Sequence, residues 1–142
     1  MNKDNKTQKD FDGKEANGKN IPWQDLFDYL RDPVFIINSD RKVVKTNNAA
    51  VELLEKSKDE IEGKMCHELL RKLPNPSSEC PLEACLSGDC NQTEVFYASS
   101  IGRHLKERIF PMTREKRTDS VVYFTLHLQD ITEEKQRIEN LA

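Results

Sequence analysis

The sequence lacks any long hydrophobic run. Its longest apolar stretches, such as Val34 to Ile37 and Val121 to Phe124, fall far short of the roughly 18 residues that a membrane span needs. No hydrophobic segment follows Met1 that would indicate a secretory signal. We therefore expect a cytoplasmic protein that enters no membrane, in a compartment where thiols stay mostly reduced.

The sequence also lacks an excess of positive charge and the common catalytic motifs. Its 142 residues carry a net charge of −3, with 33% charged residues and no basic stripe, which argues against nucleic-acid binding. The five glycines are scattered singly, so no glycine-rich phosphate loop is present, and no Ser-His-Asp set or paired-carboxylate site emerges. We expect one domain with a real core and no enzymatic activity of its own.

Cysteine is absent from most of the chain and concentrated in one short segment. All four cysteines lie between residues 66 and 90: Cys66, Cys80, Cys85 and Cys90. Cys66 and Cys80 each begin a predicted helix, where free amides and the helix dipole stabilise a thiolate, so we expect both to ionise near neutral pH. Cys85 and Cys90 follow at intervals of five, unlike the C-x-x-C pair typical of zinc or iron–sulfur ligation.

Composition and periodicity divide the chain into four parts. Residues 1–20 form a polar tail that buries too little surface to order itself. Residues 21–31 form an amphipathic N-terminal helix, residues 32–130 the main folded domain, and residues 131–142 the start of a C-terminal helix. The N-terminal helix carries its apolar stripe at Trp23, Leu26, Phe27 and Leu30.

Alternating short elements in residues 32–130 predict an α+β fold. Five strands are predicted, at 34–37, 43–46, about 93–98, 103–110 and 120–129. Helical segments are predicted from about residue 48, at 66–72 and at 81–87. Between the first two of these, Ser57 and Glu60 have the spacing of a capping box that opens a single turn, and Gly63 closes it.

The two terminal helices predict a homodimer. The apolar stripe of the N-terminal helix either caps the domain's own core or pairs with a second subunit. Asp130 can cap the C-terminal helix, in which Ile131, Ile138 and Leu141 occupy heptad a and d positions. A helix of about three turns is marginal alone in water, so it needs either a symmetry mate or a continuation.

Several runs, in this order and spacing, resemble a PAS domain over about residues 23–142. They are Asp32 to Asn38, Asn47 to Ala50, Glu60 to Lys64, Pro111, and Asp130 to Glu133. The resemblance implies a five-stranded antiparallel sheet flanked by short helices, with a space between them that holds a ligand, a cofactor or only side chains.

The resemblance also implies a function. PAS domains are sensory input modules of signal-transduction proteins, often dimeric, that act on a fused or docked histidine kinase or other output domain. Their signal passes through the sheet to the helix that leaves the fifth strand. In this chain Asp130, Ile131 and Thr132 occupy that junction.

A cysteine-bearing subset of the PAS group resembles this chain more closely. Its pattern is Gly-Lys-x-Cys-aromatic-Glu, followed by a loop with Cys-x-x-Cys-Pro. The run from Gly63 to Glu68 matches the first element with His67 in the aromatic position, and Cys80 with Pro81 matches the end of the second. Ser77 replaces the first cysteine of the pair, whereas a flavin photosensor's Asn-Cys-Arg run is missing around Cys66.

Four uses of the cysteines remain open. All four thiolates, with His67 as an alternative ligand, could bind an iron–sulfur cluster or zinc. They could form a thiol–disulfide switch that senses redox state or oxygen. They could be small buried hydrophobes in a module that binds an organic ligand or serves as a plain dimerisation adaptor. Last, His67 or His104 could ligate haem.

Overall fold

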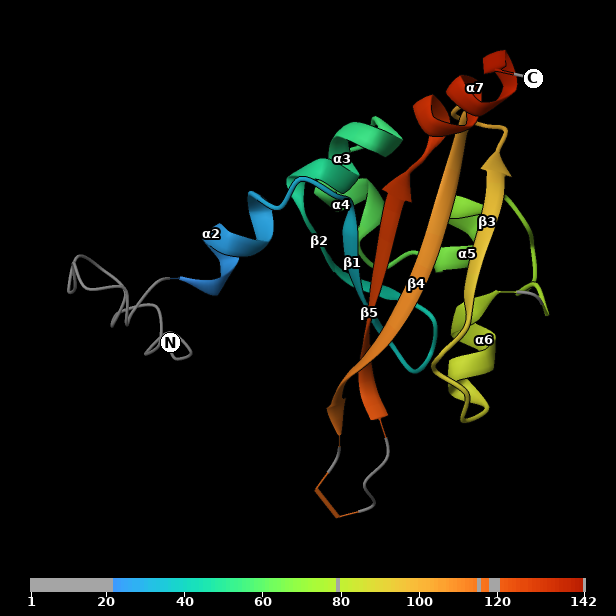
Figure 1. The fold of residues 1–142 in the computed structure, drawn as a ribbon. Coiled ribbons are helices and arrows are strands. Elements are labelled where there is room, and N and C mark those ends of the chain that lie inside the picture. Colours follow the sequence, from blue (N-terminus) through green and yellow to red (C-terminus); the bar gives the residue numbers. More distant parts are fainter. Residues whose placement is uncertain (1–21, 79, 115, 118–120, 142) are drawn as a thin grey trace.

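The computed structural model describes residues 22–78, 80–114, 116–117 and 121–141. These residues form a five-stranded antiparallel sheet with the order β2-β1-β5-β4-β3 and short helices around it (Figure 1). The predicted α+β fold is therefore confirmed. The predicted polar tail at 1–20 lies outside the described residues.

The strands agree closely with their predicted positions. Their bounds are β1 (Val34–Asn38), β2 (Val43–Thr46), β3 (Thr93–Ala98), β4 (Arg103–Arg114) and β5 (Val121–Asp130). The main difference is that β4 continues past Phe110, where the prediction ended. Pairing with β5 shifts register between Pro111 and Thr113, beyond the last residues of β4 that pair with β3. Proline is tolerated there because an edge position or bulge needs no second ladder of hydrogen bonds.

The helices follow the predicted order and are slightly shorter. Their bounds are α2 (Trp23–Asp28), α3 (Asn48–Leu54), α4 (Lys58–Ile61), α5 (Cys66–Leu70), α6 (Pro81–Leu86) and α7 (Thr132–Leu141). The predicted capping box forms, since Glu60 N donates to Ser57 Oγ and Ser57 N donates to Glu60 Oε1. Gly63 closes the turn with a φ of 90°, which favours glycine.

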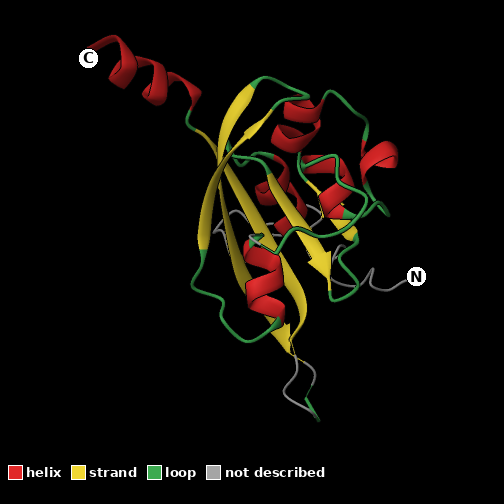
Figure 2. Cartoon of the chain, turned by 90° about the vertical axis from the view of Figure 1, so that its right-hand side faces the viewer, coloured by secondary structure: helices red, strands yellow, loops and turns green. Residues whose placement is uncertain are grey.

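The core lies between one face of the sheet and the helices α3 to α6, which gather on that face (Figure 2). The sheet contributes inward side chains that are at most 2% exposed, namely Phe35, Ile37, Leu105, Ile109, Phe124, Leu126 and Leu128. Helices α3 to α6 contribute Ala50, Leu54, Ile61, Leu69 and Leu82. The cysteine segment therefore packs directly on the core face of the sheet.

The terminal helices stand outside this core. Neither α2 nor α7 contains a buried residue, and Trp23 in α2 is 44% exposed. The predicted amphipathic stripe thus does not cap the core, and pairing with a second subunit stays a prediction. Within the part of the chain that the structure describes, no helix is both long and apolar enough to cross a membrane.

Candidate functional site

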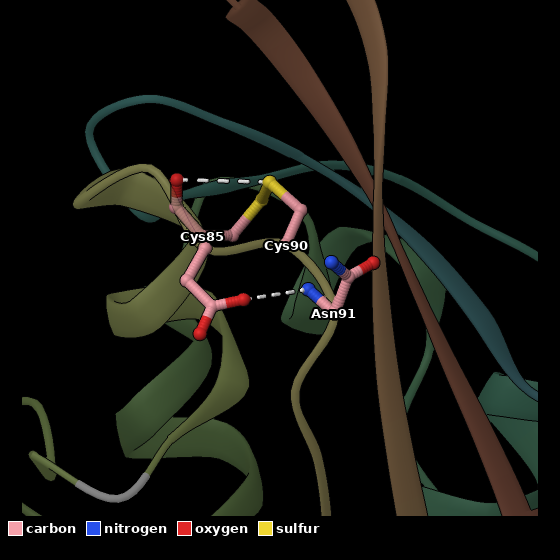
Figure 3. Close-up of a disulfide and its surroundings, with 4 residues drawn as sticks. Cys85, Cys90 and Asn91 are labelled. Carbon is pink, nitrogen blue, oxygen red and sulfur yellow. Dashed lines mark hydrogen bonds between the residues drawn. A yellow bond between two sulfur atoms is a disulfide. The ribbon is translucent and has the colours of Figure 1, made fainter.

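The four cysteines separate into two pairs of different chemistry. Cys85, near the end of α6, forms a disulfide with Cys90 just beyond that helix (Figure 3). Cys66 begins α5 and Cys80 is the N-cap of α6, and both are buried free thiols. All but the half-buried Cys90 belong to the core cluster, and Cys90 packs against it.

The disulfide closes a short loop at the protein surface. Gly88, with a φ of 109°, turns the chain back after α6, and its N–H donates to Cys85 O at 3.0 Å. Asp89 Oδ1 accepts from Asn91 N at 3.1 Å, the lower contact drawn in Figure 3, and Oδ2 accepts from Gln92 Nε2 at 2.8 Å. The bonds from Gln92 and Asn91 lower the pKa of Asp89, so its carboxylate holds this loop in place.

The opposite end of α6 adjoins a buried charge cluster. Arg71, which follows α5, places Nη2 at 2.6 Å from both Glu94 Oε1 of β3 and Glu107 Oε1 of β4. Its guanidinium also lies 4.0 Å from the centroid of the Phe96 ring. Because Glu107 is only 1% exposed, Arg71 provides the opposite charge that a buried carboxylate needs.

Cys80 connects this cluster to α6. Its thiol donates to Glu107 Oε2 at 3.6 Å, the oxygen that Arg71 leaves free. Burial raises the pKa of Glu107, against the opposing effects of Arg71 and the Cys80 hydrogen bond. One sulfur therefore joins the N-terminus of a helix to the middle of a central strand.

The expectation that Cys66 and Cys80 ionise near neutral pH is wrong. Burial, followed by the negative charge of Glu107, raises the pKa of Cys80 to about 11, although the amides of Leu82 and Glu83 act to lower it. Burial also raises the pKa of Cys66 strongly. The helix N-terminus does favour the Cys80 thiolate as expected, but the loss of solvent outweighs it.

The four sulfurs do not fit a four-thiolate metal site in this structure. Cys85 and Cys90 offer no thiolate while they are bonded to each other. Among the described residues, no group of three or more His, Cys, Asp or Glu side chains is arranged to hold a metal ion. The Cys85–Cys90 bond is the kind of pairing that the thiol–disulfide alternative requires, and that alternative stays a prediction.

The histidines considered as ligands lie in different surroundings. His67 in α5 is buried, and its Nδ1 has no hydrogen-bond partner in the part of the chain that the structure describes. His104 lies in β4, where its ring contacts that of Tyr97 in a tilted arrangement, with centroids 4.8 Å apart and planes at 48°. That either histidine ligates haem stays a prediction.

Helix α6 is also fixed to the other edge of the sheet. Arg41, in the turn between β1 and β2, donates through Nε and Nη2 to both carboxylate oxygens of Glu83, at 2.6 and 2.8 Å. Such a two-bond pair fixes orientation as well as distance. With the Cys80 hydrogen bond, it gives α6 side-chain attachments to both β4 and the β1–β2 turn.

The fold and the residues described above can be compared with known protein families. The PAS fold family matches residues 27–136, which is most of the chain. The chain belongs to the PAS family. It is thus a PAS sensory domain of the kind found in signal-transduction proteins. A search of curated protein sequences gives no match.

Solved structures share this PAS fold at low sequence identity. The PAS domain of Bordetella pertussis BvgS is 16% identical, with a TM-score of 0.57, and the match covers 84% of this chain and 90% of that one. The PAS domain of an HTR-like protein from Haloarcula marismortui is 14% identical, with a TM-score of 0.55 and coverage of 77% and 94%. An RNA-binding light-oxygen-voltage receptor is 16% identical, with a TM-score of 0.62 and coverage of 91% and 40%.

In this PAS domain the three residues predicted to couple the signal lie at the start of α7. Asp130 Oδ1 accepts from Thr132 N at 3.0 Å and from Thr132 Oγ1 at 2.6 Å. Thr132 Oγ1 accepts from His104 N at 2.9 Å, and Ile131 N donates to His104 O at 2.9 Å. The start of α7 is therefore attached to β4, the strand that carries Glu107. That these residues carry the signal stays a prediction.

Sequence reasoning missed the charge cluster of Arg71, Glu94 and Glu107. A signal for it was present, because Glu107 stands between Leu105 and Ile109 at the inward phase of a strand. A carboxylate at a core position needs a buried cationic partner. Which arginine or lysine provides it depends on how α5 packs, and the sequence pattern does not specify that.

Proposed function

We propose that this PAS domain is a cytoplasmic redox-sensing input module, in which Cys85 and Cys90 cycle between a disulfide and two thiols. The observation that carries the proposal is the position of the disulfide. It closes on the C-terminal end of α6, while the N-terminal end of the same helix bonds through Cys80 to the buried Glu107. A covalent change at one end of α6 can thus alter the packing at its other end.

The chemistry of the switch is thiol–disulfide exchange. A thiolate of a dithiol reductant attacks one sulfur of the Cys85–Cys90 bond, which breaks, and the departing cysteine takes up a proton. The reductant's second thiol loses its proton and attacks the mixed disulfide, which releases the other cysteine as a thiol. Two electrons and two protons reach the protein, and the reductant leaves as a disulfide. In a reducing cytoplasm such a disulfide forms only transiently, as a sensor requires.

Access supports the assignment of Cys85 and Cys90 as the reactive pair. Cys90 is half-buried, so a reductant can attack the bond at its sulfur, whereas Cys85, Cys66 and Cys80 are 5%, 3% and 5% exposed. The raised pKa values of Cys66 and Cys80 also keep these two thiols protonated near neutral pH. The buried pair therefore serves packing and coupling.

Transmission in this proposal runs through β4. Reduction frees the end of α6 from its covalent loop and changes how Cys80 meets Glu107. Glu107 and His104 belong to the same strand, and His104 holds Thr132 at the start of α7. The continuation of α7 then acts on a fused or docked output domain, such as a histidine kinase.

Hydrogen–deuterium exchange of the full chain in oxidised and reduced dithiothreitol tests the proposal. On reduction we expect faster amide exchange in α6 and also around Glu107 and at the start of α7. The double variant Cys85→Ser/Cys90→Ser, as a matched control, should exchange like the reduced parent under both conditions. A response confined to residues 85–90 would overturn the coupling.

Metal analysis tests the competing use of the same residues. The chain, purified without exposure to air, should contain less than one metal ion or cluster per protein and show no absorbance of an iron–sulfur centre. A bound metal that is lost in the Cys85→Ser variant would instead establish a cysteine-ligated centre and overturn the switch.

A further inference from the structure

The two cysteines of the disulfide differ in their exposure to solvent. Cys85 is 5% exposed and belongs to the core cluster, whereas Cys90, beyond the end of α6, is half-buried and only packs against that cluster. In the reduced protein a molecule that arrives from solvent can therefore meet the sulfur of Cys90, while the core shields that of Cys85. The two thiols are thus unequal partners for a small reagent.

Main-chain hydrogen bonds hold the two cysteines close together independently of the S–S bond. Gly88 N donates to Cys85 O at 3.0 Å, and Asp89 N donates to Ala84 O at 2.9 Å. With the φ of 109° at Gly88, these bonds form a Schellman motif at the end of α6. The motif turns the chain so that Cys90 Sγ lies 3.7 Å from Cys85 O, the upper contact drawn in Figure 3. Since neither bond involves a sulfur, we expect the two thiols to remain adjacent after reduction.

The charge beside Cys90 is negative. The Asp89 side chain accepts from Gln92 Nε2 and Asn91 N, and these bonds lower its pKa, so it is a carboxylate at neutral pH. No arginine, lysine or histidine among the described residues forms an ion pair with it. Its charge therefore repels an anionic oxidant at Cys90 and has little effect on an uncharged one.

Resting on the redox function proposed above, we propose that Cys90 is the cysteine oxidised first, by a small uncharged hydroperoxide such as hydrogen peroxide, and that Cys85 is the resolving cysteine. The half-buried position of Cys90 favours a small oxidant. The Asp89 carboxylate favours an uncharged oxidant over an anion such as glutathione disulfide. Neither Cys66 nor Cys80 competes, because both are buried.

The chemistry takes place in two steps. The Cys90 thiolate attacks one oxygen of hydrogen peroxide, the O–O bond breaks, and the departing hydroxide takes up a proton to leave as water. Cys90 is thereby oxidised by two electrons to a sulfenic acid. The Cys85 thiol then loses its proton and attacks Cys90 Sγ, the S–O bond breaks, and the departing hydroxide leaves with that proton as water. One peroxide and two thiols give one disulfide and two waters.

Trapping of the sulfenic acid identifies the cysteine that reacts first. The full-chain variant Cys85→Ser, reduced and then treated with hydrogen peroxide and dimedone, should be labelled at Cys90, because no resolving thiol removes the sulfenic acid. The matched variant Cys90→Ser should be labelled at Cys85 at least about tenfold more slowly. Peptide mass spectrometry measures both rates, and the peptides that contain Cys66 and Cys80 serve as unlabelled internal controls.

Equal labelling of the two variants would overturn the assignment of roles. Circular dichroism checks that each variant is folded. The variant Cys85→Ala repeats the measurement without a hydroxyl in the core, and it should be labelled at Cys90 like Cys85→Ser.

Removal of the Asp89 charge tests the class of oxidant. The rates at which hydrogen peroxide and glutathione disulfide consume the Cys90 thiol are measured separately, and their ratio should fall about threefold in Asp89→Asn at low salt. The ratio is the useful quantity, because a change in the thiolate fraction of Cys90 affects both rates equally. The control Asp25→Asn removes the same charge from α2, which lies outside the core, and should leave the ratio unchanged. A constant ratio in Asp89→Asn would refute the selectivity.

This inference and the redox proposal on which it rests fail in different ways. The exchange experiment described above uses dithiothreitol, so a response that reaches α7 without labelling of Cys90 would reject the hydroperoxide step alone. Labelling of Cys90 together with a response confined to residues 85–90 would reject the coupling alone.

Discussion

Two pairs of cysteines lie within 25 residues of one another, and the tertiary structure gives them opposite properties. Cys66 and Cys80 lie at the starts of helices, yet both are buried free thiols, and burial raises their pKa values. Cys85, at the end of α6, is as buried as Cys80, but it is bonded to the half-buried Cys90. For the two free thiols, burial therefore affects the pKa more strongly than a position at a helix N-terminus does.

The difference also separates two tasks within one helix. The disulfide at the end of α6 includes the half-buried Cys90, while the buried thiol at its start donates a hydrogen bond to a buried carboxylate. The redox function that we propose uses both, the disulfide as the group that reacts and the buried contact as the one that responds. The following four experiments perturb one pair or the other.

The largest effect is expected from removing Arg71, which pairs with Glu107, the buried carboxylate that accepts from Cys80. Arg71→Ala leaves Glu107 buried without its opposite charge, which should lower the free energy of unfolding by about 3 to 5 kcal/mol. Urea unfolding of the oxidised protein measures it. Arg103→Ala removes an exposed ion pair with Asp130 and should cost less than about 1 kcal/mol. Equal losses in both variants would contradict the role of the buried cluster.

Alkaline pH should destabilise the protein because the buried free thiols resist ionisation in the folded state. The pKa of Cys80 rises from 9.0 to about 11 on folding, so the unfolded chain releases its proton first as the pH increases. Stability from this thiol is complete below pH 9 and is lost between about pH 9 and 11, by roughly 2 to 3 kcal/mol. Urea unfolding across this range measures the loss. Cys80→Ser should show a smaller decrease, and an identical curve would refute the assignment.

Reducing the accessible pair should have a more moderate effect. Closing the six-residue loop from Cys85 to Cys90 contributes about 2 kcal/mol by restricting the unfolded chain. Dithiothreitol should therefore lower the melting temperature of the parent. It should leave that of Cys85→Ser/Cys90→Ser unchanged, and a shift in the double variant would place the effect elsewhere.

The smallest effect concerns the single bond between Cys80 and Glu107. Cys80→Ser keeps a hydroxyl that can donate to Glu107 Oε2, whereas Cys80→Ala leaves that oxygen without its donor. The alanine variant should be less stable than the serine variant by about 1 kcal/mol in denaturant unfolding. The reverse order would show that apolar packing at residue 80 outweighs the hydrogen bond.

Much of the fold could be predicted from local sequence signals. The bounds of β2 and β3, the capping box at Ser57 and Glu60, and the turn at Gly63 all matched, because each depends on residues near one another in the chain. The extension of β4 past Phe110 was missed, since it depends on pairing with the distant strand β5 across a shift in register. The candidate site was found as a cysteine segment, but its division into two pairs was not.

The sequence by itself determined the PAS fold, the crowding of four cysteines into two helices and a loop, and the apolar stripe of α2. These properties follow from the spacing of residue types along the chain, which the sequence gives directly. Only the tertiary structure decided that Arg71 meets Glu107, that Cys80 bonds to that carboxylate, and that Cys85 pairs with Cys90. Burial, and with it every pKa in the core, depends on which distant segments exclude water from one another.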